Sequence, residues 1–124
     1  METTPLPQPD PYEPDNDLQS ARPIEAGATQ QHNFIGRSDE DWLKLDLQAG
    51  QTYSSETFDL AADVDTVIEL FDAQGQSLAV NDDSDGFVSR IEFRPSRSAT
   101  YYVRITNIGV AMFGATYQVR VSVR

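Results

Sequence analysis

Residues 117–124 read Tyr-Gln-Val-Arg-Val-Ser-Val-Arg, an alternation of apolar and polar side chains. The same period of two runs through residues 41–47, 90–94 and 100–107. Successive side chains of a β-strand point to opposite faces, so each stretch has one apolar face and one polar face. The pattern therefore predicts half-buried strands of an antiparallel sheet.

Turn-forming residues separate these stretches at regular intervals. We expect strands near residues 24–27, 32–36, 41–47, 51–58, 65–71, 76–80, 88–94, 100–107 and 115–124. Residues 58–65 could hold a helical turn, but Asp63 and Asp65 favour a loop. Short, evenly spaced strands without a convincing helix predict an all-β protein, an antiparallel sandwich or barrel.

Composition limits the possible functions. The 124 residues suffice for one domain, and the absence of cysteine excludes disulfides and thiolate metal sites. A formal net charge of −11 argues against nucleic-acid binding and suits divalent cations. No apolar run is long enough to cross a membrane, so we expect no membrane insertion.

The N-terminal region differs from the rest of the chain. Prolines at positions 5, 7, 9, 11 and 14 are typical of an extended, semi-rigid linker. We therefore expect a linker over residues 1–17 and a single β-domain over 18–124. No signal peptide follows Met1. If the protein is exported, the chain is a mature fragment with an added methionine; a free-standing cytoplasmic protein is the alternative.

One segment has nearly the spacing of a calcium loop. Residues 81–92 place oxygen ligands at Asn81, Asp83 and Asp85, a glycine at 86 and a carboxylate at Glu92. An EF-hand needs flanking helices, whereas the residues on both sides alternate as strands. We therefore reject an EF-hand and expect Glu92 on a solvent-facing strand. The loop is either a weak calcium site or an acidic turn in which Asp and Asn cap backbone amides.

Several short motifs, in order, carry a resemblance to a known family. They are Tyr12–Asn16, Asp39–Trp42, Ala49–Tyr53, Asp65–Asp72, Asn81–Asp83, Ser89–Ile91 and Tyr101–Ile105. In sequence and spacing they resemble the bacterial pre-peptidase C-terminal domain, an accessory domain of secreted peptidases. The collagen-binding domains of clostridial collagenases are similar. The resemblance covers the chain from about residue 12 to residue 124.

The resemblance implies a jelly-roll-like β-sandwich of eight or nine strands that has no catalytic activity and often binds calcium. The calcium ligands of the collagen-binding relatives correspond here to Glu13, Asp15, Asn16, Asp39 and Asp41. Pro11 stands where those relatives have a further glutamate, which puts one ion of a two-ion site in doubt.

The residues themselves leave two interpretations of this acidic cluster open. Carboxylates from separate segments can supply the six to eight oxygens that calcium prefers. Glu13, Asp15 and Asp17 would converge with Asp39 and Asp41 if the N-terminal segment packs beside the loop before Trp42. The alternative is a solvated acidic linker next to a solvated turn.

Aromatic residues suggest a second class of site. Trp42 and Tyr102 fall on the polar faces of their strands, where an exposed ring could bind a sugar or a collagen-like helix. The alternative is that Trp42 packs under the N-terminal segment or a loop. His32 is the only histidine, and a lone histidine in a strand favours a structural role. No motif of a known catalytic class is present.

We therefore expect a non-catalytic, calcium-stabilised accessory domain of a secreted or cell-surface bacterial protein. Its expected partners are an upstream catalytic domain of the same polypeptide, a peptidase, and a substrate or surface polymer. An independent collagen- or polysaccharide-binding module and a structural spacer or folding aid removed on maturation are the alternatives. We expect a monomer.

Overall fold

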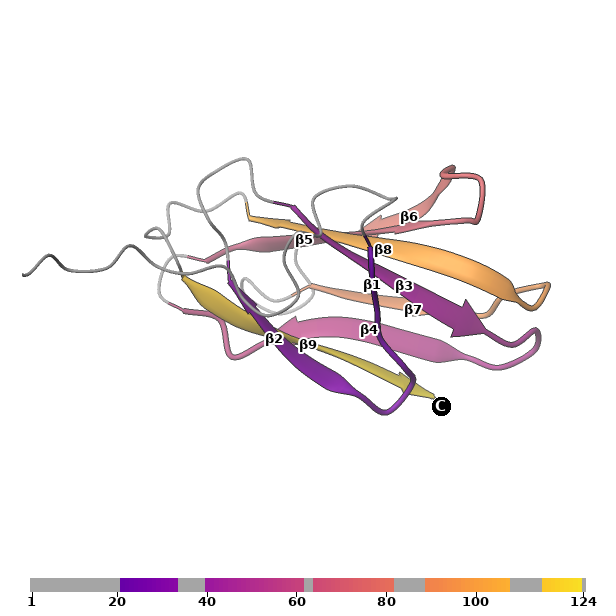
Figure 1. Cartoon of the computed structure of the whole chain (residues 1–124), viewed down its shortest axis with the longest axis horizontal. Helices are drawn as coiled ribbons and strands as arrows, with labels where there is room; N and C mark the ends of the chain where they lie inside the picture. Colours follow the sequence, from indigo (N-terminus) through magenta and orange to yellow (C-terminus); the bar gives the residue numbers. More distant parts are fainter. Residues whose placement is uncertain (1–20, 34–39, 62–63, 82–88, 108–114, 124) are drawn as a thin grey trace, which may run out of the picture.

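The computed structural model describes residues 21–33, 40–61, 64–81, 89–107 and 115–123. These parts of the chain form two β-sheets packed face to face (Figure 1). The strands are β1 (Arg22–Pro23), β2 (Thr29–Asn33), β3 (Asp41–Leu47), β4 (Tyr53–Phe58), β5 (Thr66–Phe71), β6 (Ser77–Asn81), β7 (Arg90–Phe93), β8 (Ala99–Asn107) and β9 (Thr116–Val123). None of the described residues belongs to a helix that could span a membrane.

One sheet has five strands in the order β1-β3-β8-β5-β6, and the other has four in the order β2-β9-β4-β7. Every neighbouring pair is antiparallel except β1 with β3, which is parallel. The predicted all-β antiparallel sandwich is therefore confirmed. The expected linker over residues 1–17 lies outside the described residues.

The core fills the space between the two sheets with the alternate residues of their strands. The five-stranded sheet contributes Leu43 and Ile105, and the four-stranded sheet contributes Tyr117, Val119 and Val121, all fully buried. Each of these residues lies on the apolar face that the alternation predicts. Burial of apolar surface, at about 25 cal/mol per Å², stabilises the sandwich.

The first two strands differ from the sequence prediction. The expected strand at 24–27 contains a turn, in which the amide of Ala28 donates to the carbonyl of Glu25 (3.0 Å) and Gly27 has a φ of 91°. The following strand runs over residues 29–33 rather than 32–36. Its sequence is Thr-Gln-Gln-His-Asn, and only His32 is fully buried, so it has no apolar alternation to reveal its position.

A buried group of hydroxyls joins the two sheets. Thr57 lies on β4 of the four-stranded sheet and Thr66 on β5 of the five-stranded sheet, and their Oγ1 atoms are 2.7 Å apart. Ser89 Oγ lies 3.1 Å from Thr66 Oγ1, and the amide of Ser89 donates to Thr57 Oγ1 (2.9 Å). Buried polar atoms need such partners, and here they cross-link the layers.

Candidate functional site

A buried carboxylate marks one end of the sandwich. Asp41 is the first residue of β3 and has no exposed surface. The Tyr117 hydroxyl on β9 donates a hydrogen bond to Asp41 Oδ2. His32 on β2 places Nδ1 3.8 Å from Asp41 Oδ1. Burial of a carboxylate is costly unless it has such partners, so these three side chains form one structural unit between the sheets.

His32 is held in place from both sides. It is the cross-strand neighbour of Tyr117, and the two rings stack with their centroids 5.8 Å apart. Its Nε2 lies 2.9 Å from Oε1 of Gln30, whose amide nitrogen donates to the carbonyl of Pro23. Because that bond orients the Gln30 amide, its oxygen accepts and His32 Nε2 carries a proton. This geometry suits a structural histidine.

Of the five residues proposed as calcium ligands, Asp41 is the one whose position the structure describes. Glu13, Asp15, Asn16 and Asp39 lie outside the described residues. Within the described ranges, no three acidic or histidine side chains cluster as a metal site would require.

Glu40, which precedes Asp41, interacts with the outer face of the five-stranded sheet. Its Oε1 accepts a hydrogen bond from Trp42 Nε1 (3.1 Å), and its Oε2 lies 3.8 Å from the Arg104 guanidinium.

In the second candidate site, Asn81 is described, whereas Asp83 and Asp85 lie outside the described residues. Asn81 ends β6, and its side-chain oxygen accepts a hydrogen bond from the amide of Arg90 on β7 (3.0 Å). The Asn81 side chain thus caps a backbone amide at the start of the next strand, β7. The flanking elements are strands, as the alternation predicts. Glu92 is exposed on β7 and pairs with Arg90 at 2.7 Å.

The strand register fixes how these two regions relate. Asp41 pairs with Ile105, Ile105 with Ile68, and Ile68 with Asn81, so Asp41 and Asn81 lie in one row across four strands. Three strand spacings of about 4.8 Å place their Cα atoms roughly 14 Å apart. A calcium ion binds oxygens within about 2.6 Å. Asp41 and Asn81 therefore border the same end of the sandwich but cannot ligate one ion.

The structure favours the packed alternative for Trp42 over an exposed ring. Trp42 does lie on the outer face of its strand, yet only 8% of it is exposed. Its ring packs against Phe71 with centroids 4.9 Å apart, and the Arg104 guanidinium lies 5.6 Å from the Trp42 centroid. Ala21 belongs to the same cluster, and half-buried Tyr102 packs against it. Trp42 is thus a packing residue, and Tyr102 keeps partial access to solvent.

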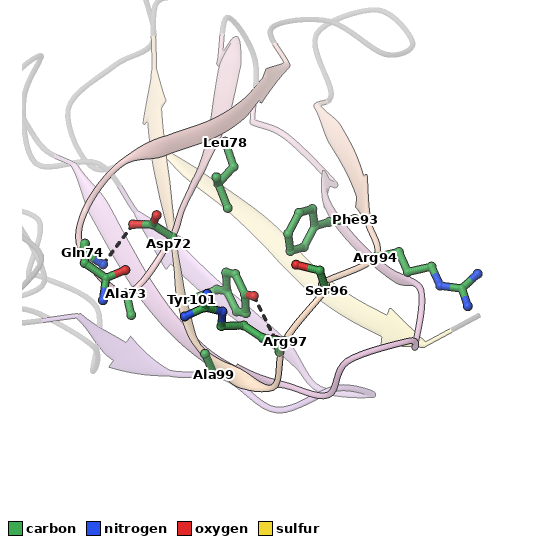
Figure 2. A pocket seen from close by; sticks show the side chains of 10 residues that line it. All are labelled: Asp72, Ala73, Gln74, Leu78, Phe93, Arg94, Ser96, Arg97, Ala99 and Tyr101. Carbon is green, nitrogen blue, oxygen red and sulfur yellow. Dashed lines mark hydrogen bonds between the residues drawn. The ribbon is translucent and has the colours of Figure 1, made fainter.

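A pocket of about 390 Å³ lies at the opposite end of the sandwich (Figure 2). Its walls come from residues 72–74 and from Arg94, Ser96 and Arg97. Leu78, Phe93 and Tyr101 supply apolar surface. In Figure 2, Arg97 extends along the pocket beside Tyr101, whereas Arg94 points away from it. This pocket is absent from the sequence prediction, because its walls are two turns that are far apart in the chain.

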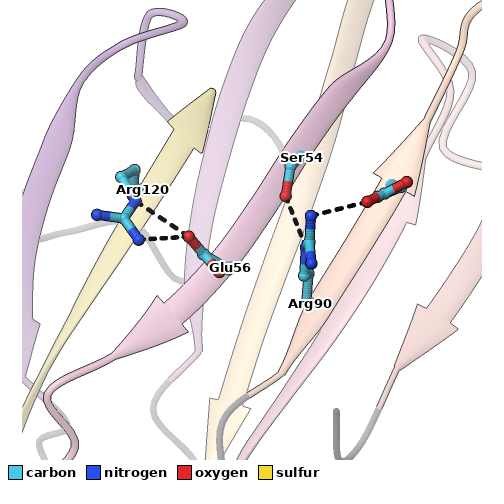
Figure 3. A network of polar contacts seen from close by, with 5 residues as sticks. Ser54, Glu56, Arg90 and Arg120 are labelled. Carbon is cyan, nitrogen blue, oxygen red and sulfur yellow. Dashed lines mark hydrogen bonds and ion pairs between the residues drawn. The ribbon is translucent and has the colours of Figure 1, made fainter. Parts of the chain in front are cut away.

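The outer face of the four-stranded sheet is polar and internally paired (Figure 3). Arg120 on β9 donates to Glu56 on β4, and Arg90 Nε donates to Ser54 Oγ (3.0 Å). Arg120 also lies over the ring of Phe58, 4.6 Å from its centroid. Arg120 thus pairs with Glu56 on the neighbouring strand and Arg90 with Glu92 on its own strand, so these charged groups of the described part of the face already have partners.

Asp41 was predicted as a calcium ligand, and the sequence also contains a signal that it is buried. It lies two residues before Leu43, so the alternation places it on the same inward face as Leu43, Leu45 and Leu47. The alternation also places Tyr117 inward, but it does not show that Tyr117 and His32 contact Asp41, because the three residues meet only when the two sheets pack together.

Comparison with known proteins shows that the chain is similar to part of a longer protein. No family model matches the sequence. Over 106 residues, 82% of the chain, it is 30% identical to a protein of Deinococcus radiodurans described as a probable subtilase-type serine protease. The chain spans 15% of the length of that relative. The similarity is therefore to one module of a much longer protein.

Two solved structures share the fold. The pre-peptidase C-terminal domain of a Bacillus anthracis collagenase matches with a TM-score of 0.68 at 14% identity, over 82% of this chain and 94% of that one. A periplasmic inhibitor of g-type lysozyme from Aeromonas hydrophila, PliG, matches with a TM-score of 0.60 at 17% identity, over 82% and 96% of the two chains. The chain has the fold of a pre-peptidase C-terminal domain, and the resemblance indicated by its sequence motifs is thus confirmed.

Proposed function

We propose that this chain is a non-catalytic accessory domain of an exported bacterial peptidase, attached to a catalytic domain in the same polypeptide. The observation that carries the proposal is the fraction of each relative that the chain covers. The chain aligns with nearly the whole of a collagenase's C-terminal domain but with only 15% of a subtilase-type protease. A module that recurs beside different protease types supports a role in assisting a peptidase rather than in cleavage itself.

The test of this role compares the parent peptidase with and without residues 18–124. With a short chromogenic peptide as substrate, kcat/KM should stay unchanged, because the catalytic site is intact. With an insoluble protein polymer as substrate, the rate should fall severalfold when the domain is deleted. Equal rates of polymer cleavage would overturn the assisting role. Loss of activity toward the short peptide would instead indicate a contribution to the catalytic site or to its folding.

We further propose that calcium stabilises this domain through Glu13, Asp15, Asn16, Asp39 and Asp41. All five supply side-chain oxygens, the donors that calcium prefers. Asp41 accepts the Tyr117 hydroxyl through Oδ2, and its Oδ1 lies 3.8 Å from His32 Nδ1, so coordination of a cation by Oδ1 would take place beside the His32 ring. A bound ion would bring these side chains together around a positive charge and link metal binding to folding.

Thermal unfolding of the EDTA-treated chain, with and without millimolar calcium, tests the proposal. Calcium at about 100 times its Kd should add about 2.7 kcal/mol to the free energy of unfolding and raise the Tm. Asp39→Ala should abolish this rise. Asp46→Ala is the matched control, because that carboxylate accepts a hydrogen bond from Thr100 Oγ1 (2.8 Å) and lies at the other end of β3.

The outcome also separates the two candidate regions. If Asp83→Ala rather than Asp39→Ala removes the rise, the ion binds in the 81–85 loop. An unchanged Tm in the unsubstituted chain would overturn calcium stabilisation and leave the accessory role standing. Asp41→Ala is less informative alone, because the same change removes the partner of Tyr117.

A second candidate function, polymer binding by the domain itself, is favoured by the surroundings of Tyr102. This half-buried residue borders a largely polar hollow of about 560 Å³ beside Lys44, Asp46 and Thr100. Aromatic rings with polar neighbours suit sugar or collagen-like ligands. A glycan array and a collagen pull-down should give binding that Tyr102→Ala removes and that Arg120→Ala, on the other sheet, leaves intact. No binding would favour a spacer or folding aid.

A further inference from the structure

The pocket between the 72–74 and 94–97 turns is formed in advance by hydrogen bonds within its own walls. On one side, Asp72 Oδ1 accepts from the amides of Gln74 and Gln76, both at 2.9 Å. On the other, the Tyr101 hydroxyl donates to the carbonyl of Arg97 (2.9 Å). Because these bonds hold both turns without a ligand, binding would require little additional ordering.

The pocket floor is apolar and well packed. The rings of Phe93 and Tyr101 meet edge to face with centroids 5.3 Å apart. Leu78 lies across the pocket from Phe93 (Figure 2), and 44% of it is exposed to solvent. A large aliphatic residue this exposed beside two aromatic rings offers apolar surface to a ligand.

Arg97 brings an exposed positive charge to this pocket. Within the described residues, the sheet-face arginines Arg90, Arg104 and Arg120 each pair with a glutamate. Arg97 is exposed and makes no ion pair there. In a chain with a formal net charge of −11, such a guanidinium beside an apolar floor is complementary to an external anion.

We propose that this pocket binds the C-terminal residue of a peptide that ends in an apolar or aromatic side chain. The terminal carboxylate lies against the Arg97 guanidinium, and the side chain lies on Leu78, Phe93 and Tyr101. A C-terminal residue carries both groups on one Cα, which matches the guanidinium of Arg97 next to the apolar side chains that line the pocket. The site requires neither calcium nor a neighbouring catalytic domain.

The test is a titration of the 124-residue chain, followed by ¹H–¹⁵N NMR, with N-acetyl-L-phenylalanine and with its neutral amide. The free acid should give saturable shifts at the amides of Leu78, Phe93 and Arg97, with a Kd in about the millimolar range expected for so small a ligand. The neutral amide should bind about tenfold more weakly, since it lacks the charge-assisted hydrogen bond.

Two variants test whether the Arg97 guanidinium is the group that binds the ligand's carboxylate. Arg97→Gln should weaken binding of the acid about tenfold and bring acid and amide to similar affinity. Arg120→Gln removes the same charge from the outer face of the four-stranded sheet, away from the residues that line the pocket, and should leave the affinity unchanged. Equal binding of acid and amide, equal effects of the two substitutions, or no saturable shifts would each overturn the proposal. The peptidase-deletion and calcium experiments can succeed or fail independently of this result.

Discussion

The hydroxyl of Tyr117 on β9 donates a hydrogen bond to the carboxylate of Asp41 on β3, and the bond joins the two sheets at one end of the sandwich. Both residues are fully buried. The bond therefore belongs to the class in which loss of one partner leaves a buried charge poorly satisfied.

Replacing Tyr117 by phenylalanine should lower the free energy of unfolding by about 2 kcal/mol, because it removes a hydrogen bond to a buried carboxylate. Urea denaturation at neutral pH measures the change. Tyr53→Phe is the control, since the Tyr53 hydroxyl accepts from the backbone amide of Gln48 (2.9 Å) and its loss should cost about 1 kcal/mol. Equal costs for the two substitutions would show that the charge of Asp41 contributes nothing.

Thr66→Val should destabilise the domain by about 1–3 kcal/mol. Valine keeps the shape of threonine but deprives Thr57 and Ser89 of a hydroxyl partner in the buried group that joins the sheets. Thr100→Val, at a partly exposed threonine that bonds Asp46, should change stability by less than about 0.5 kcal/mol. A neutral Thr66→Val would mean that the buried hydroxyls do not depend on one another.

Ser55→Ala should stabilise the protein by about 1 kcal/mol, because it removes a hydroxyl that has no hydrogen-bond partner among the described residues. Ser55 faces a core void of about 20 Å³ lined almost entirely by apolar side chains. Ser55→Val should add a further gain if its methyl groups fill that void.

Ser54→Ala provides the comparison for this prediction. Ser54 precedes Ser55, but its hydroxyl accepts from Arg90 Nε, so removal should be neutral or mildly destabilising. Thermal unfolding of the three variants distinguishes the sites. A loss of stability in Ser55→Ala would indicate that the hydroxyl is satisfied in solution, for instance by a water molecule.

Arg104→Gln should lower stability by about 1–2 kcal/mol and shift the fluorescence emission of Trp42 to longer wavelength. The Arg104 guanidinium covers both Trp42 and Phe71 and pairs with Glu69, so its loss uncovers the indole. Trp42 is the only tryptophan, and its emission therefore reports this cluster alone. Arg120→Gln, on the other sheet, should leave the emission unchanged, whereas easy iodide quenching in the unsubstituted chain would contradict burial.

Periodicity predicted the fold because burial on one face determines the alternation. Leu43, Leu45 and Leu47 lie inward as expected, and the strand from residue 41 to 47 has the predicted bounds. The strand around His32 was misplaced, because polar side chains occupy most of its positions. Alternation therefore succeeds where a strand is packed by apolar residues and fails where tertiary contacts place a polar strand.

The candidate site was less predictable because its contacts cross between strands. The alternation predicted the strand face on which Trp42 lies. It did not predict that Phe71 and Arg104 cover the Trp42 ring, because strand pairing in the sheet brings them next to it. The inward hydroxyl of Ser55 likewise departs from the apolar pattern. The polarity of a residue indicates which face of its strand it occupies. The partner that hydrogen-bonds the side chain or covers it from solvent depends on how the strands pair in the sheets.

The short strand β1 has a consequence for self-association. It closes one edge of the five-stranded sheet with two residues, and the second is Pro23, which has no backbone N–H to offer an added strand. The opposite edge is β6, where 63% of Val80 is exposed. The two edges thus differ in their resistance to strand addition, and aggregation of this sheet in concentrated solution would begin at β6.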